Sequence, residues 1–128
     1  MLRKGGRLLI LYSDWDMCTW DSKDPLVTRR MGAGRAAQFA HAYLPRELHW
    51  LAGAAGLTLL NADVFSIIET RYDKDSFGVG MIETTCETAL RYGVPAAEVA
   101  AWEEDLRSRE TEGEWFFCLN RFMFSATK

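Results

Sequence analysis

Residues 114–127 read EWFFCLNRFMFSAT, and this stretch decides how the rest of the chain is arranged. Its length and composition predict a strand. Both alternating sets of side chains are mostly apolar: Phe117, Leu119 and Met123 on one face, and Phe116, Cys118, Phe122 and Phe124 on the other. A strand that is apolar on both faces is typical of the centre of a sheet, with helices above and below it. We therefore expect the last strand to be central.

Two further stretches predict strands. The continuous apolar run from Gly6 to Tyr12 follows a Gly-Gly turn, and residues 57–72 are rich in β-branched and apolar types, which favours one long or bulged strand. Capping residues and helical spacing predict four helices: from Pro25 toward Phe39, with Gly32 and Gly34 weakening its middle; from Leu44-Pro45 to Gly56; from Asp75 or Ser76 to Gly93; and from Pro95 onward, with Val99, Trp102 and Leu106 inward. This order predicts a single α/β domain over residues 1–128.

The composition excludes several classes of protein. A chain of 128 residues with 48% hydrophobic side chains is large enough for a core, and 15 basic against 18 acidic residues leave no footprint for nucleic acid. No apolar stretch approaches the roughly 20 residues of a membrane span, and no secretory signal is present, so we expect a soluble, cytoplasmic protein without a membrane partner. The three cysteines have no metal-ligand spacing, which predicts neither a metal site nor a disulfide framework.

Four stretches together resemble the C-terminal half of a class I S-adenosylmethionine-dependent methyltransferase of the group that acts on small molecules. They are LRKGGRLLILYSDWD at 2–16, AAGL at 54–57, ETRYDKDSFGVGMIE at 69–83 and FFCLNRFMFSAT at 116–127. The resemblance covers nearly the whole chain. It implies a partial Rossmann-like sheet made of the equivalents of the family's strands 5, 6 and 7, with strand 7 antiparallel between the other two. Lys4 and Tyr12 depart from the family, which commonly has Pro and Asp there.

The resemblance also implies what this half lacks. The family holds its cofactor at a Gly-rich turn after the first strand and at an acidic residue after the second. Neither feature is in this sequence, since residues 32–34 (GAG) and 78–80 (GVG) lie within helical patterns and follow no strand. We therefore expect no cofactor-binding residues here, and S-adenosylmethionine binding only if a cofactor-binding half comes from another chain or from a longer gene.

The first strand is expected to lack the neighbour that the family's fourth strand would supply. An unpaired edge of this kind exposes a row of backbone donors and acceptors. A second copy of the chain, placed edge to edge about a two-fold axis, is the favoured cover, which predicts a homodimer. A separate chain carrying the cofactor half, or a helix folded over the edge, is the alternative.

Ligands of open α/β sheets bind at the carboxyl ends of the strands, which here places the pocket at residues 13–20, SDWDMCTW. Methyl transfer requires proximity and orientation, and sometimes a base for the proton of the acceptor. Asp14 and Asp16 are the candidate base or substrate-orienting carboxylates. The alternative is that they cap the loop and face water.

Five further residues are candidates for binding the acceptor. Trp15 and Trp20 either form walls for an aromatic molecule or pack against the following helix. Tyr12 ends the first strand, and Arg71 and Tyr72 end the second, where they line the pocket or remain exposed. The hypotheses for function are a substrate-side methyltransferase half that is inactive alone; a non-catalytic dimeric small-molecule-binding or accessory protein; and a cofactor-free catalyst that uses Asp14 or Asp16.

Overall fold

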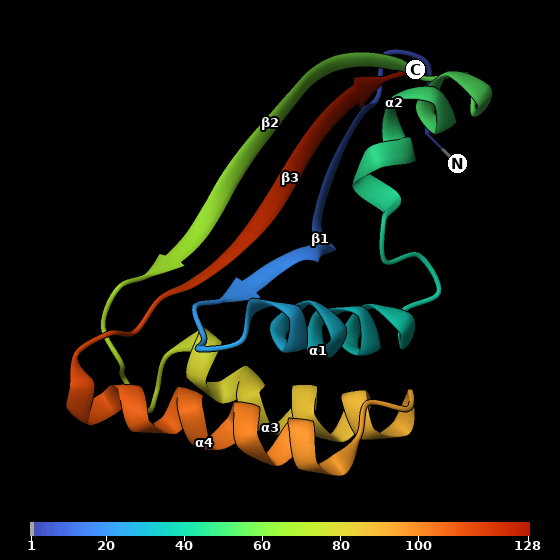
Figure 1. Cartoon of the computed structure of the whole chain (residues 1–128). Coiled ribbons are helices and arrows are strands. Elements are labelled where there is room, and N and C mark those ends of the chain that lie inside the picture. Colours follow the sequence, from blue (N-terminus) through green and yellow to red (C-terminus); the bar gives the residue numbers. More distant parts are fainter. Residues whose placement is uncertain (1) are drawn as a thin grey trace.

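Three strands form one antiparallel sheet in which the last strand lies between the other two (Figure 1). The computed structural model describes residues 2–128. Its elements are β1 (Arg7–Trp20), α1 (Pro25–Ala37), α2 (Leu44–Ala54), β2 (Thr58–Glu69), α3 (Phe77–Arg91), α4 (Ala96–Glu112) and β3 (Phe117–Thr127). The predicted order of strands and helices is confirmed, and so is the central, antiparallel position of β3. Because β1 and β2 are both antiparallel to β3, they run parallel to each other.

The sheet has a bulge in each outer strand. In β2 the register shifts between Leu59 and Asn61, so of the two alternatives left open by the sequence, a long or a bulged strand, the structure has the bulge. The larger break is in β1, where Ser13 pairs with Arg121 but Cys18 pairs with Leu119. Five steps along β1 therefore correspond to two steps along β3, and the extra residues form the segment around Asp14.

The predicted end of β1 is wrong. We expected the strand to stop at Tyr12 and a loop to follow, but β1 continues to Trp20. After the bulge, Thr19 pairs with Cys118 and Trp20 with Phe117, and the side chain of Trp20 is buried. Burial of an aromatic side chain supplies the driving force that keeps this polar-looking segment in the sheet.

Helices cover the sheet on opposite faces at its two ends, which corrects the expectation that β3 has helices above and below along its length. At the end where the chain termini lie, which we call the α2 end, Phe124 and Ala126 face α2 and are buried. At the other end, the three-helix end, Phe117 and Leu119 are buried in the core with side chains of α1, α3 and α4 (Figure 1). Residues of odd and even number on a strand point to opposite faces, so each end leaves one face open.

Aromatic side chains fill the core of the three-helix end. The ring of Trp20 lies edge-on to Trp102 at 5.3 Å and tilted against Phe117 at 5.0 Å. The indole nitrogen of Trp102 donates a hydrogen bond of 2.9 Å to Oγ1 of Thr28, so its one polar atom is satisfied. The predicted inward face of α4, namely Val99, Trp102 and Leu106, is confirmed.

Two glycines allow close approach between elements at this end. A Cβ added to Gly34 would lie 2.9 Å from the Cα of Ala89, so the glycine lets α1 cross α3 closely. Gly32 and Gly34 do not break α1, which is one continuous helix. A Cβ added to Gly78 would overlap the ring of Phe117 and lie 2.7 Å from Oε2 of Glu69.

The outer edge of β1 has no strand beside it within residues 2–128. β1 pairs with β3 alone. One backbone hydrogen bond, 3.2 Å from the amide of Trp15 to the carbonyl of Ala42, ties the bulge to the loop before α2. On the adjoining open face, Leu9 and Leu11 are exposed, Leu9 by 64%.

Candidate functional site

The bulge of β1 carries a buried ion pair. The side chain of Asp14 is fully buried, and Arg46 of α2 donates to both of its oxygens, from Nε to Oδ2 at 2.6 Å and from Nη2 to Oδ1 at 3.0 Å. Nη2 also donates to Oδ2 of Asp16 at 2.8 Å, and the amide of Asp16 donates to Oδ1 of Asp14 at 3.1 Å. A bidentate ion pair of this kind fixes the plane of the guanidinium group. The structure thus brings Asp14 and Asp16 together through Arg46.

The fold explains why these residues meet. Pro45 lies in the first turn of α2, where its missing N–H costs nothing, and Arg46 follows it. α2 connects the parallel strands β1 and β2, so its first turn returns to the point where the first part of β1 ends. The hydrogen bonds that Arg46 donates to Asp14 and, as the second cause, to Asp16 raise the pKa of Arg46 above its ordinary value, which keeps the guanidinium charged.

A hollow of about 340 Å³ lies beside the ion pair. Its floor is apolar and comes from β2 and β3, and its rim comes from the β1 bulge and the first turn of α2. The lining residues are Asp14, Met17, Pro45, Arg46, Ala62, Asp63, Val64, Phe122 and Phe124. We call this space the Arg46 hollow. Sequence reasoning found Asp14 but missed Arg46, whose only local signal was a Pro-Arg pair at the start of a helix.

The contacts of Asp14 favour orienting over proton transfer. Oδ2 accepts from Arg46, and Oδ1 accepts from Arg46 and from the amide of Asp16. A carboxylate that serves as a base must reach the proton of its substrate, and these bonds occupy both oxygens. The arrangement is suited to holding Arg46 in one orientation at the edge of the hollow.

The aromatic residues predicted near Asp14 lie in different surroundings. The ring of Trp15 stacks on Phe39 with centroids 4.5 Å apart, and the guanidinium of Arg35 lies 5.0 Å from the Trp15 ring centre. Tyr12 pairs in register with Phe122 and is half-buried on the sheet face that carries the Arg46 hollow. Neither Trp15 nor Tyr12 is among the residues that line the hollow.

The remaining predicted residues are not brought to this site. Trp20 lies in the core, where its indole nitrogen donates to the carbonyl of Gly78 at 3.0 Å; of its two alternatives, packing is the one observed. Tyr72 packs edge-on against Trp115 at 5.1 Å, and Arg71 is exposed. A role in binding for Arg71 and Tyr72 stays a prediction.

Glu69, which ends β2, caps α3. Its carboxylate accepts hydrogen bonds from Oγ of Ser76 at 2.8 Å, from the amide of Gly78 at 2.8 Å and from the indole nitrogen of Trp115 at 3.2 Å. A carboxylate at the positive end of a helix is stabilising. The end of β2 is therefore occupied by structural contacts.

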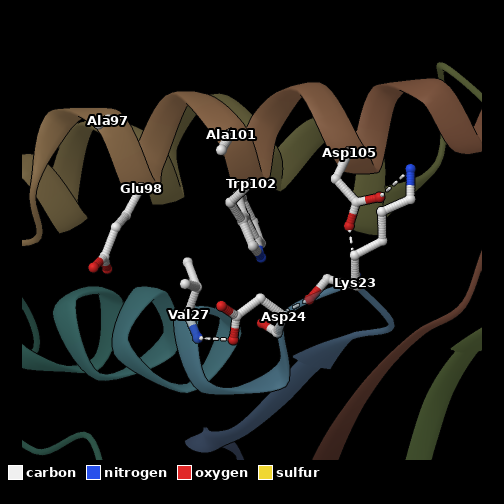
Figure 2. Close-up of a pocket in the computed structure, with 9 residues that line it drawn as sticks. Lys23, Asp24, Val27, Ala97, Glu98, Ala101, Trp102 and Asp105 are labelled. Atoms are coloured by element: carbon white, nitrogen blue, oxygen red, sulfur yellow. Dashed lines mark hydrogen bonds and ion pairs between the residues drawn. The ribbon is translucent and has the colours of Figure 1, made fainter.

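A second hollow, of about 410 Å³, separates α1 from α4 (Figure 2). Asp24 caps α1 by accepting from the amides of Leu26 and Val27 at 3.0 and 3.1 Å. Across the gap, Asp105 accepts from the backbone amide of Lys23 at 2.7 Å, and its other oxygen lies 3.6 Å from the Lys23 ammonium. These charged groups join the two helices, so this hollow is an inter-helix groove (Figure 2).

Other kinds of site find little support in the part of the chain that is described. It contains no group of three His, Cys, Asp or Glu residues placed to hold a metal ion. The three cysteines are free thiols. None of the helices within residues 2–128 has the length and apolar character that crossing a membrane requires.

The glycine-rich segments do not fit a nucleotide cofactor. Both lie inside helices, α1 and α3, and close packing against Ala89 and against Phe117 accounts for Gly34 and Gly78. A nucleotide turn requires glycines that leave room for a phosphate after a strand. Residues 2–128 therefore offer no such turn for S-adenosylmethionine. No protein-family model matches the chain, and no curated protein matches it.

Proposed function

We propose that this chain is the substrate-side half of an S-adenosylmethionine-dependent small-molecule methyltransferase. The observation that carries the proposal is the strand order β1-β3-β2, with β3 antiparallel between two parallel strands. The methyltransferase resemblance implies this order for the last three strands of the family's sheet. An antiparallel strand inserted between two parallel strands is a specific topology, so the agreement supports the family assignment more than an α/β pattern alone would.

The Arg46 hollow is the proposed place of the methyl acceptor. It lies where the first part of β1 ends and α2 begins, which is the edge at which open α/β sheets bind their ligands. In this proposal the apolar floor takes the body of the acceptor, Arg46 contacts its polar group, and Asp14 and Asp16 orient Arg46. Methyl transfer depends mainly on such positioning.

The outer edge of β1 and the open face that carries Leu9 and Leu11 are the proposed contact with a cofactor-binding half. Another polypeptide that covers this region would pair the free backbone groups of the strand edge and bury the exposed leucine side chains, and both changes favour association. In this proposal the isolated chain transfers no methyl group, because the contacts to the methyl donor belong to the other half. A second copy paired through β1 is the other occupant of this edge.

A non-catalytic small-molecule-binding or accessory protein is the second candidate. It is favoured by one observation: an apolar hollow with a fixed guanidinium group at its rim lies on residues that include no Gly-rich turn after a strand. A ligand could therefore bind without any cofactor-binding half. The two candidates differ in whether S-adenosylmethionine binds when the other half is present.

The test is to express the chain together with any coding sequence beside it that carries a Gly-rich turn after a strand, and to titrate the product with S-adenosylmethionine by calorimetry. We expect binding by the combined protein and none by the chain alone. Leu9→Lys should weaken that binding at least about tenfold by placing a charge on the contact face, since buried unpaired charges are costly. Leu60→Lys in β2, where the side chain is 54% exposed against 64% for Leu9, is the matched control and should have no effect.

Two outcomes would contradict the methyltransferase proposal. One is tight cofactor binding by the lone monomeric chain, which would place the methyl donor on residues that offer no fit for it. The other is a stable homodimer with no cofactor affinity and no adjoining sequence of the required kind. That result would favour the accessory protein.

A further inference from the structure

We infer that the Arg46 hollow binds a neutral, largely apolar ring compound through a carbonyl or hydroxyl oxygen that accepts a hydrogen bond from Arg46. Three features of the hollow support this ligand class: the donors that Arg46 has left, the balance of charges around it, and the apolar floor.

Arg46 retains donors for a ligand. A guanidinium group has five N–H bonds. Nε uses its one on Asp14, and Nη2 uses its two on Asp14 and Asp16. Nη1 has no acceptor among residues 2–128, and the side chain is 45% exposed at the rim of the hollow. The two carboxylates thus fix the guanidinium while leaving one nitrogen to contact a bound molecule.

The charges around the hollow exclude ions of either sign as the preferred ligand. Two carboxylates, those of Asp14 and Asp16, bind the single guanidinium of Arg46, so this cluster carries a net negative charge. An anionic ligand would meet a net negative site. A cationic ligand would be repelled by the guanidinium of Arg46, and both oxygens of Asp14 already accept hydrogen bonds from Arg46. A neutral oxygen satisfies Nη1 without either conflict.

The floor of the hollow fits an aromatic or alicyclic body. Ala62, Val64, Phe122 and Phe124 form it, and the rings of Phe122 and Phe124 lie 6.5 Å apart. At the rim, the sulfur of Met17 accepts from the amide nitrogen of Asn120 at 3.6 Å, which orients this flexible side chain. A space of about 340 Å³ is at the small end of ligand sites, which suits a compact ring system.

As a statement about the methyl acceptor, this inference rests on the proposed function. As a statement about binding, it is independent of the cofactor and can be measured on the chain alone. The two can therefore fail separately. If the chain does not prefer the neutral probe but the combined protein still binds S-adenosylmethionine, only the ligand class is overturned.

The experiment titrates the full chain at pH 7 with four probes of one shape: 2-naphthol, naphthalene, 2-naphthoate and 2-naphthylmethylamine. Binding is followed by calorimetry and by amide chemical shifts in residues 62–64 and 122–124. We expect 2-naphthol to bind about tenfold more tightly than naphthalene, the size of one hydrogen bond from a charged donor. We also expect it to bind more tightly than the anionic and the cationic probe. Equal affinity for all four, or tightest binding of 2-naphthoate, would overturn the inference.

Two variants locate the site. Val64→Trp places a large ring in the hollow and should weaken 2-naphthol binding at least about tenfold. Ile68→Trp is the matched control, because Ile68 lies on the same face of the same strand, is 60% exposed against 58% for Val64, and does not line the hollow. Equal effects of the two variants would contradict the assignment.

A third variant tests the role of Arg46. Arg46→Lys keeps a positive charge for Asp14 and Asp16 but removes the planar fork and its free nitrogen. We expect it to abolish the preference for 2-naphthol over naphthalene while naphthalene binding stays within about twofold. An unchanged preference would show that Arg46 does not contact the oxygen. The Val64 and Ile68 pair, both exposed, keeps the inference testable even if this variant does not fold.

Discussion

The two ends of the sheet differ in how completely they are covered. At the three-helix end, Phe117 and Leu119 of β3 are almost fully inaccessible, and three helices pack around them. At the α2 end, α2 covers one face, while Leu9 and Leu11 on the other face are exposed beside an unpaired strand edge. The first end is a core that this chain completes by itself. The second presents a surface that contributes little to folding and is free for contacts with another molecule.

The largest expected difference between the ends comes from one substitution made in both. Leu106→Ala in the three-helix core should lower the free energy of unfolding by about 2–5 kcal/mol, because it removes buried methyl groups and leaves a cavity. Leu9→Ala at the α2 end should change it by less than about 0.5 kcal/mol. Urea denaturation of both variants measures the difference. Similar losses would show that the open face of β1 is covered in the free chain.

A pair of glycine substitutions in α3 sharpens the comparison within the three-helix end. Gly78→Ala should destabilise the protein by about 1–3 kcal/mol, because the added methyl group would overlap Phe117 and crowd Glu69. Gly80→Ala meets nothing within 4 Å and should stabilise α3 by up to about 1 kcal/mol. Thermal unfolding of the two variants should therefore shift in opposite directions, and shifts of the same sign would contradict this packing.

Cysteines on the covered and on the open face of the three-helix end should contribute differently to the pH dependence of the free energy of unfolding. Burial raises the pKa of the Cys18 thiol from 9.0 to about 12. Above pH 9 the unfolded chain loses this proton while the folded chain keeps it, so stability should fall as the pH rises from about 9 to 12. The slope from Cys18 is about 1 kcal/mol per pH unit. Urea denaturation of the wild-type protein at pH 8, 9, 10 and 11 measures it.

The control compares two cysteines from opposite faces of this end. Cys18→Ala should remove that part of the slope. Cys118→Ala, on the open face opposite Thr19, should leave it in place. Burial also raises the pKa of Cys86 to about 12, so a smaller slope should remain after Cys18→Ala. An unchanged slope would contradict the contribution of Cys18.

Much of this fold could be predicted from local sequence. The apolar residues on both faces of residues 116–124 placed β3 in the centre, and Asp24-Pro25 and Ser76 marked the starts of α1 and α3. The continuation of β1 past Tyr12 could not be predicted, because its polar residues resemble a loop. Only pairing with β3 after the bulge shows that Cys18 and Trp20 point into the core.

The candidate site was predicted in part for a related reason. Asp14 and Asp16 lie two residues apart in the chain, and their position after an apolar strand indicated an exposed edge of the sheet. Arg46 lies 30 residues further on and reaches them only through the return of α2. Contacts of this kind depend on tertiary structure. The sequence also did not predict that helices cover opposite faces of the sheet at its two ends. The residue pattern of β3 does not tell which helix covers which half of the strand.

Amide hydrogen exchange, resolved by residue on a sample whose mass is measured by light scattering, tests the open edge of β1 most directly. For a particle of 14.6 kDa, one chain, we predict that alternate amides of residues 7–12 exchange orders of magnitude faster than those of β3. In any larger particle paired through this edge, the same amides should become protected. A 14.6 kDa particle in which every amide of residues 7–12 is as slow as β3 would contradict the account.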